Sequence, residues 1–95
     1  MLLACSTPRR DITNVLVLEG KPERGQALYQ MHCARCHGAE GGGISTNPDL
    51  ARTSPGLQDP VIVDAMLNGR GAMTRQSLDD QQVADVLAWM RKTWL

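Results

Sequence analysis

The stretch Cys33-Ala34-Arg35-Cys36-His37 determines how the rest of this chain is interpreted. Its two cysteines stand three positions apart, and a histidine directly follows the second. This is the attachment pattern of c-type haem, because the two sulfurs of one helical turn reach two positions along one porphyrin edge. The histidine then lies beneath the ring, where its imidazole can bind iron. The pattern predicts one haem c attached through Cys33 and Cys36, with His37 as an axial ligand.

Two other kinds of site use a pair of cysteines at this spacing. A zinc ribbon needs four good ligands, but the remaining cysteine is the distant Cys5 and the remaining histidine, His32, directly precedes Cys33. A thioredoxin-type dithiol begins a helix in a strand-rich unit, and little strand pattern surrounds Cys33. Haem attachment is therefore the favoured interpretation, with a dithiol and a metal site as the alternatives.

Composition limits the size of the core. The chain has 95 residues and is 42% hydrophobic, but it contains no Phe, one Tyr and two Trp. This length predicts a single domain, and a haem packed against Leu, Val, Ile and Met would compensate for the scarce large side chains. Ten basic and ten acidic residues give a formal net charge of zero, so no overall field favours nucleic acid or an anionic membrane surface.

The N-terminal residues resemble the end of a bacterial lipoprotein signal, in which a short apolar run and a small residue precede a lipidated cysteine. Here that cysteine is Cys5, but no charged region precedes it, so either the gene begins further upstream or the likeness is accidental. Residues 6–11 would form a polar tether, and the apolar residues 12–18 would pack on the domain or extend along it. We expect a signal-like remnant and tether over residues 1–20 and a folded domain over residues 21–95, with no stretch long enough to span a bilayer.

From residue 21 onward, the sequence predicts three helices. Pro22 suits the first position of a helix that carries the two haem cysteines at its end. Residues 38–53 contain three consecutive glycines and are expected to form a loop. Asp59 is expected to cap a second helix over about Pro60–Asn68, which Gly69 would end.

The third helix has the clearest start. Asp79 can cap it, Gln82 completes a capping box, and Leu78 and Val83 flank the cap as a hydrophobic staple. Apolar residues then recur at helical spacing, namely Val83, Val86, Leu87, Met90 and Trp94. This pattern predicts one buried face, with Asp85, Arg91 and Lys92 on the other.

From about residue 20 to its end, the chain resembles the class I single-haem cytochrome c family. Gly25 and Tyr29 look like the glycine and aromatic residue of that family's N-terminal helix, while Val86 and Trp89 match positions of its C-terminal helix. The resemblance implies an all-α cytochrome c fold, with three to four helices around one covalently bound haem and the terminal helices crossing. It also implies that Trp89 packs against Tyr29.

The resemblance extends to a short loop after the haem motif. Pro48 and Leu50 look like the family's Pro-x-Leu segment. This implies that the Pro48 carbonyl accepts the proton on the far nitrogen of His37, which fixes the ring, and that Leu50 packs on the haem plane. The alternative is an ordinary turn proline followed by a core leucine.

Five methionines compete for the sixth position on iron. Met73 lies in a loop between two helices, where the resemblance implies that the ligand is supplied. The others are expected in the leader or the core, namely Met1, Met31, Met66 and Met90. Many relatives place a proline next, whereas Thr74 follows Met73 here, so the sulfur–iron bond is expected to be easier to displace.

With His37 and Met73 on iron, no coordination position remains for a substrate. We therefore expect an electron carrier between respiratory or periplasmic redox partners, and not an enzyme. One alternative is a haem sensor in which a diatomic gas replaces Met73. Another is the cytochrome subunit of a larger oxidoreductase.

Four arginines in segments expected near the haem bear on the choice of partner. Arg35, Arg52, Arg70 and Arg75 can form a basic rim for an acidic redox protein, with ordinary solvated charge as the alternative. Arg52, Asn68 and Arg70 are candidates to bond the haem propionates. We expect a monomer that forms transient complexes with a donor and an acceptor, and no nucleic-acid partner.

In the family that this chain resembles, haem is attached outside the cytoplasm. We therefore expect a periplasmic location, with membrane contact only through a lipid on Cys5.

Overall fold

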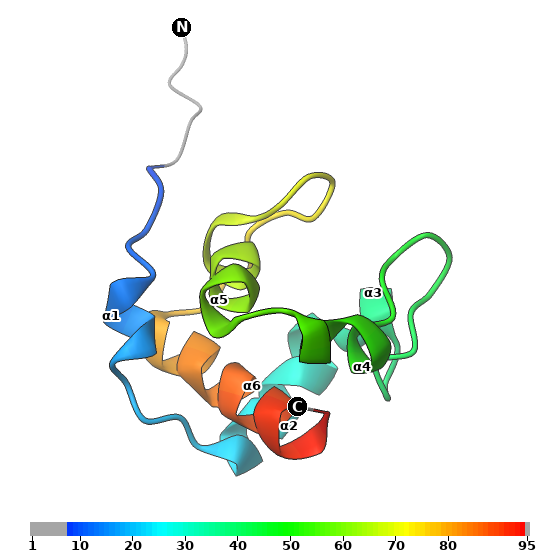
Figure 1. Cartoon of the computed structure of the whole chain (residues 1–95), viewed down its shortest axis with the longest axis horizontal. Coiled ribbons are helices and arrows are strands. Elements are labelled where there is room, and N and C mark those ends of the chain that lie inside the picture. The colour runs from blue at the N-terminus through cyan, green and yellow to red at the C-terminus, as the bar shows by residue number, and fades with distance from the viewer. Residues whose placement is uncertain (1–7, 95) are drawn as a thin grey trace, which may run out of the picture.

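The computed structural model describes residues 8–94, and it is built from helices joined by loops (Figure 1). The helices are α1 (Thr13–Leu16), α2 (Pro22–His32), α3 (Ala34–His37), α4 (Leu50–Thr53), the 3-10 turn η1 (Ser54–Gly56), α5 (Asp59–Asn68) and α6 (Asp80–Thr93). No strand longer than an isolated bridge occurs among these residues. The all-α prediction is confirmed. The expected three to four helices are too few, because α1, α3 and α4 are single turns too short to show a period.

Helices α2 and α6 cross at two glycines. Gly25 is buried, and a Cβ atom at this position would overlap the backbone carbonyl of Asp85. Gly20, just before α2, faces the carbonyl of Ala84 in the same way. The absence of a side chain therefore lets the two backbones meet, which confirms the close crossing expected at Gly25.

All three aromatic residues of the chain gather on one side of this crossing. The ring centroid of Tyr29 lies 4.7 Å from that of Trp89 and 5.5 Å from that of Trp94, and the two indoles are 5.0 Å apart. The Tyr29 hydroxyl donates to the Gly38 carbonyl at 2.7 Å, and the Trp94 ring lies against Gly41. The cluster therefore joins the helix crossing to the loop that follows the haem motif.

Helix α6 begins as its sequence predicts. The backbone N–H of Gln82 donates to Asp79 Oδ1 at 2.8 Å, and the Gln82 side chain accepts from the Asp79 N–H at 2.9 Å. Leu78 and Val83 are both buried beside this cap. The expected apolar face is buried except for Trp94, which is half-buried. The helix is covered on more than this face, because α1, α2 and α5 all pack on it.

Asp85 corrects the expectation that the polar face of α6 is solvated. It is 2% exposed, and Oδ1 accepts from the Lys21 N–H at 2.8 Å and from Gln81 Nε2 at 3.0 Å. Oδ2 lies 3.2 Å from Arg24 Nε. The buried carboxylate thus holds the start of α2 on α6, and periodicity alone placed it wrongly because it ignores this second covering helix.

Helix α5 begins one residue earlier than expected. Asp59 is its first residue and not its cap; Gln58 holds the cap position without a side-chain bond. The carboxylate of Asp59 instead pairs with Arg91 on α6. Gly69 ends the helix with φ of +84°, as predicted.

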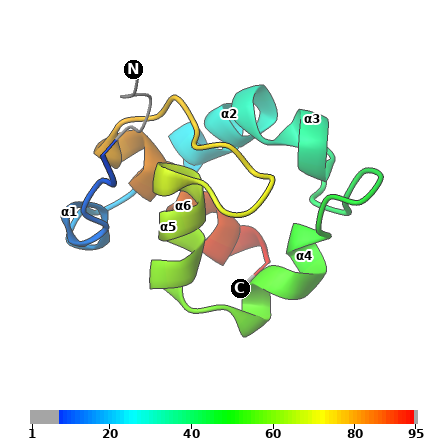
Figure 2. The ribbon, with the colours of Figure 1, turned by 90° about the horizontal axis from the view of Figure 1, so that it is seen from above.

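The N-terminal segment packs on the domain. α1 lies against α5 and α6, with Val15 buried between them, as expected for the apolar residues 12–18 (Figures 1 and 2). Ile12 is half-buried against the core, whereas Leu16, Val17 and Leu18 are exposed. Cys5 lies outside the described residues. Within residues 8–94, no helix has both the length and the apolar character needed to cross a membrane.

Candidate haem site

The two cysteines lie on a tight turn at the end of α2. Cys33 is both the C-cap of α2 and the N-cap of α3. Its carbonyl accepts from the N–H groups of Cys36 at 3.1 Å and His37 at 2.9 Å. Cys33 is buried, whereas Cys36 is exposed. Burial, with a smaller contribution from the Cys36 charge, raises the pKa of the Cys33 thiol to about 11.

His37 is buried and oriented by one backbone carbonyl. Its Nδ1 lies 3.0 Å from the carbonyl oxygen of Pro48, the contact that the family resemblance implied. Because a carbonyl oxygen only accepts, this contact requires the proton on Nδ1 and leaves the Nε2 lone pair free for a metal. The donor set therefore suits iron coordination through Nε2.

The loop that brings Pro48 back to His37 depends on glycine. Gly38 and Gly43 adopt φ of +86° and +87°, and the Gly43 N–H donates to the His37 carbonyl at 2.7 Å. A Cβ at Gly43 would lie 2.9 Å from the Asn47 carbonyl oxygen. The chain can therefore fold back sharply after the haem motif.

Residues 38–53 are a loop only as far as Asp49. The Asp49 side chain accepts from the Arg52 N–H at 3.1 Å and caps α4, so the end of this segment is helical, contrary to the expectation. Leu50, the first residue of α4, is half-buried and packs against the hydrophobic core.

Met73 lies at the end of a tight turn between α5 and α6. Its N–H and carbonyl exchange hydrogen bonds of 2.9 Å with the carbonyl and N–H of Arg70, and Gly71 between them has φ of +58°. The Met73 side chain is half-buried against the core. Figure 2 shows this connection (yellow) extending from α5 toward the side of the molecule that carries α3 and α4.

The other described methionines differ from one another. Met66 and Met90 are 4% and 3% exposed, which agrees with their expected packing role. Met31 is 71% exposed, so its expected place in the core or leader is wrong. The reason is helical geometry: α2 buries the face that carries Gly25 and Tyr29, and Met31, two residues later, points to the other side.

Asn68 does not fit its expected role at the propionates. Its Oδ1 accepts from the Arg10 N–H at 2.6 Å, and its Nδ2 donates to the Arg10 carbonyl at 3.0 Å and to Asp64 Oδ1 at 2.8 Å. These protein bonds occupy the whole amide. Arg52 and Arg70, the other candidates, are exposed.

Ser54 is a polar group that the sequence did not single out. It is 1% exposed, and its hydroxyl has no hydrogen-bond partner in the part of the chain described here. A buried hydroxyl is costly unless it is bonded, so a polar group of a bound cofactor is a natural partner for it. The two thiols, the oriented imidazole and the thioether are the donor types that a haem c requires.

The all-helical fold and this donor set define a class I c-type cytochrome. Residues 20–90 match the family described as cytochrome C oxidase, cbb3-type, subunit III, and the chain belongs to that family.

Similar proteins are also cytochromes. The chain is 32% identical over 72 residues to cytochrome c-551 of Bacillus subtilis, covering 76% of this chain and 63% of that protein. It is 30% identical over 81 residues to a cytochrome c-553-like protein of Synechocystis, covering 84% and 76%. The chain thus spans less than two thirds of the length of the first relative.

The crystal structure of cytochrome cL from Hyphomicrobium denitrificans is similar in fold. The TM-score is 0.61 at 23% identity, covering 85% of this chain and 48% of that one. At this identity the likeness supports the fold alone, and it agrees with the cytochrome c architecture expected from the sequence.

Proposed function

We propose that this chain is an electron-transfer protein with one haem c, attached through Cys33 and Cys36 and ligated by His37 and Met73. The contact between His37 Nδ1 and the Pro48 carbonyl carries the proposal, because it leaves Nε2 as a metal donor on the residue that directly follows the second cysteine. When bound, haem supplies an iron that gains or loses one electron.

The protein's own residues prepare this coordination. The Pro48 carbonyl holds the proton on His37 Nδ1, so the imidazole keeps one tautomer and one orientation and donates more strongly through Nε2. Met73 supplies a thioether from a separate loop, and Leu50 supplies apolar surface for the ring plane. With His37 and Met73 holding the iron, the chain would keep small ligands and substrates off the metal and would serve as an electron carrier.

A redox partner would approach an exposed, arginine-bearing surface. Arg35, Arg52 and Arg70 are exposed and Arg75 is half-buried, and we propose them as a basic rim for an acidic donor or acceptor. Such complexes are small and short-lived, which suits a monomer that must release one partner before meeting the next.

We also propose a periplasmic location with a lipid anchor on Cys5. The apolar residues and small residue before Cys5, together with haem attachment outside the cytoplasm in this family, support this part of the proposal.

The test is to produce the full chain with the haem-attachment machinery and to record its native mass and ferric spectrum. One haem, together with a methionine-to-iron charge-transfer band that disappears in a Met73→Ala variant, is the expected result. Fast carbon monoxide binding to the reduced protein, with no such band, would instead favour a gas-binding domain. The same mass measurement reports a lipid on Cys5.

A further inference from the structure

The connection between α5 and α6 is fastened at both ends by the same N-terminal residue. We name residues 69–77 the Met73 loop and residues 8–12 the N-terminal arm. At the start of the loop, the backbone N–H and carbonyl of Arg10 form hydrogen bonds of 2.6 Å and 3.0 Å with the Asn68 side chain. At its end, the Arg10 guanidinium donates to the Leu78 carbonyl at 2.7 Å and to Asp80 Oδ1 at 2.6 Å.

Neighbouring residues of the arm strengthen this arrangement. Arg9 Nη2 pairs with Asp64 Oδ1 at 2.6 Å, and the same oxygen accepts from Asn68 at 2.8 Å. Within the loop, Arg75 donates to the Pro8 carbonyl at 3.2 Å. The arm therefore contacts the helix before the loop, the loop itself and the segment after it.

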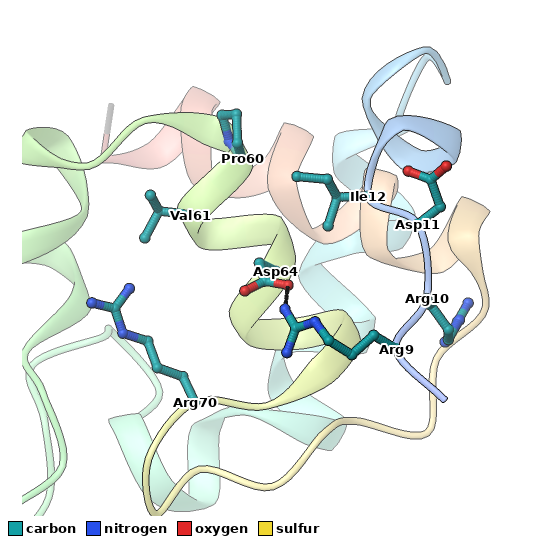
Figure 3. A pocket seen from close by; sticks show the side chains of 8 residues that line it. All are labelled: Arg9, Arg10, Asp11, Ile12, Pro60, Val61, Asp64 and Arg70. Atoms are coloured by element: carbon teal, nitrogen blue, oxygen red, sulfur yellow. Dashed lines mark hydrogen bonds and ion pairs between the residues drawn. The ribbon is translucent and has the colours of Figure 1, made fainter. Parts of the chain in front are cut away.

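Figure 3 shows how the two arginines divide these contacts. Arg9 points toward Asp64 on α5, while Arg10 leaves the arm on the other side, toward the chain that leads into α6. An open pocket of about 480 Å³ lies between the arm, α5 and Arg70 of the Met73 loop. Cys33, Cys36 and His37 do not line this pocket.

Short-range hydrogen bonds hold the Met73 loop. Besides the pair between Arg70 and Met73, the Gly69 N–H donates to the Ala65 carbonyl of α5 at 3.0 Å and the Gln76 N–H donates to the Met66 carbonyl at 3.0 Å. The Gln76 side chain also donates to the Thr74 carbonyl at 2.9 Å. Gly69 and Gly71 add backbone freedom within it. A segment of this kind opens more readily when its ends are released, because fixed ends restrict the conformations it can sample.

We propose that Arg10 is a positioning residue for Met73. By bonding both ends of the Met73 loop, Arg10 limits the opening of that loop and so keeps the methionine sulfur at the iron. This inference rests on the proposed assignment of Met73 as the sixth ligand. It gives the N-terminal arm a role in ligation, which sequence alone described as part of a tether.

The test uses the full haem-loaded chain and compares Arg10→Ala with Arg91→Ala. Arg91 is a matched control, because it also pairs with a carboxylate on another element, Asp59, but does not touch the Met73 loop. Imidazole binding to the ferric protein measures how often the sulfur leaves the iron. We expect Arg10→Ala to raise the binding rate about tenfold, the order expected for losing charge-assisted hydrogen bonds. Arg91→Ala should match the parent protein.

Two further measurements separate positioning from general stability. Arg10→Lys keeps the charge and one bond, so its imidazole rate should fall between those of the parent and Arg10→Ala. Hydrogen exchange should quicken at the amides of Arg70, Met73 and Gln76 in Arg10→Ala, and stay unchanged in α2. Hydrogen exchange reports the opening of the Met73 loop directly, so it does not depend on which residue binds the iron.

Three outcomes would overturn the inference. If imidazole binds Arg10→Ala and the parent at equal rates, Arg10 does not position Met73. If the rate rises equally in Arg10→Ala and Arg91→Ala, the effect reflects a general loss of stability. If Met73→Ala leaves the ferric spectrum unchanged, the ligand assignment itself is wrong, and this failure is distinguishable because it does not depend on Arg10.

Discussion

The imidazole of His37 and the carbonyl of Pro48 meet at 3.0 Å, although the whole glycine-rich loop separates them in sequence. The contact forms because Gly38 and Gly43 turn the backbone in ways that other residues resist. The orientation of the proposed axial ligand thus depends on loop conformation as much as on the haem motif.

Replacing Pro48 tests this dependence. Pro48→Ala keeps the carbonyl but frees the backbone, so we expect a loss of about 0.5–1 kcal/mol in the free energy of unfolding. If the hydrogen bond from His37 Nδ1 to residue 48 weakens, Nε2 donates less strongly to iron. The reduction potential should therefore rise. Redox titration and denaturant unfolding measure the two effects. A potential that does not change would show that the Pro48 contact has no influence on the iron.

The crossing of α2 and α6 has no room for a side chain at Gly25. Gly25→Ala forces a methyl group onto the Asp85 carbonyl, and we expect a loss of about 3 kcal/mol or more in unfolding free energy. Gly56→Ala is the matched control, because a Cβ there would meet nothing within 4 Å. Denaturant unfolding followed by circular dichroism compares the two. Similar midpoints for both variants would contradict the close crossing.

Sequence reasoning succeeded where one local signal had one meaning. The capping box of Asp79 and Gln82, the stop at Gly69 and the pairing of Tyr29 with Trp89 depend on short patterns or on a family likeness, and the structure contains all of them. The attachment motif, together with the helix and loop residues that resemble the cytochrome c family, likewise predicts the class of protein that the family match supports.

Sequence reasoning failed where the answer depended on a second covering element. Asp85 was placed on a solvated face because periodicity describes one helix and not the helix that crosses it. Asn68 is a propionate candidate by sequence, but its amide bonds the backbone of Arg10. The role of Arg10 had no sequence signal, because its partners lie 58 to 70 positions away.

The buried hydroxyl of Tyr29 makes stability depend on alkaline pH. Burial is the main cause that raises its pKa from 10.0 to about 12. Because the folded pKa is the higher one, the contribution is fully present below pH 10 and is lost as pH rises toward 12. The unfolding free energy should fall by up to about 1.4 kcal/mol per pH unit in that window.

Tyr29→Phe is the variant that checks this pH dependence. It loses the bond to the Gly38 carbonyl, so it should be less stable by about 1 kcal/mol at neutral pH. Its stability should then vary less between pH 10 and 12 than that of the parent. If the unfolding free energy of the variant and of the parent falls equally between pH 10 and 12, another group causes the alkaline effect.

Acid should loosen the Met73 loop through Asp64. The hydrogen bond from Asn68 is the largest cause that lowers the pKa of Asp64 below 3.8, burial opposes it, and Arg9 adds to the lowering. Because the folded pKa is the lower one, the contribution is present above pH 3.8 and is lost as pH falls below it. In an acid titration, the methionine charge-transfer band of Asp64→Asn should therefore be weaker than that of the parent at neutral pH and should decrease less on acidification, because the variant lacks the titrating carboxylate. Asp11→Asn is the control, since Asp11 also has a lowered pKa but bonds Thr13. If the band responds to acid in the same way in both variants, it does not depend on Asp64.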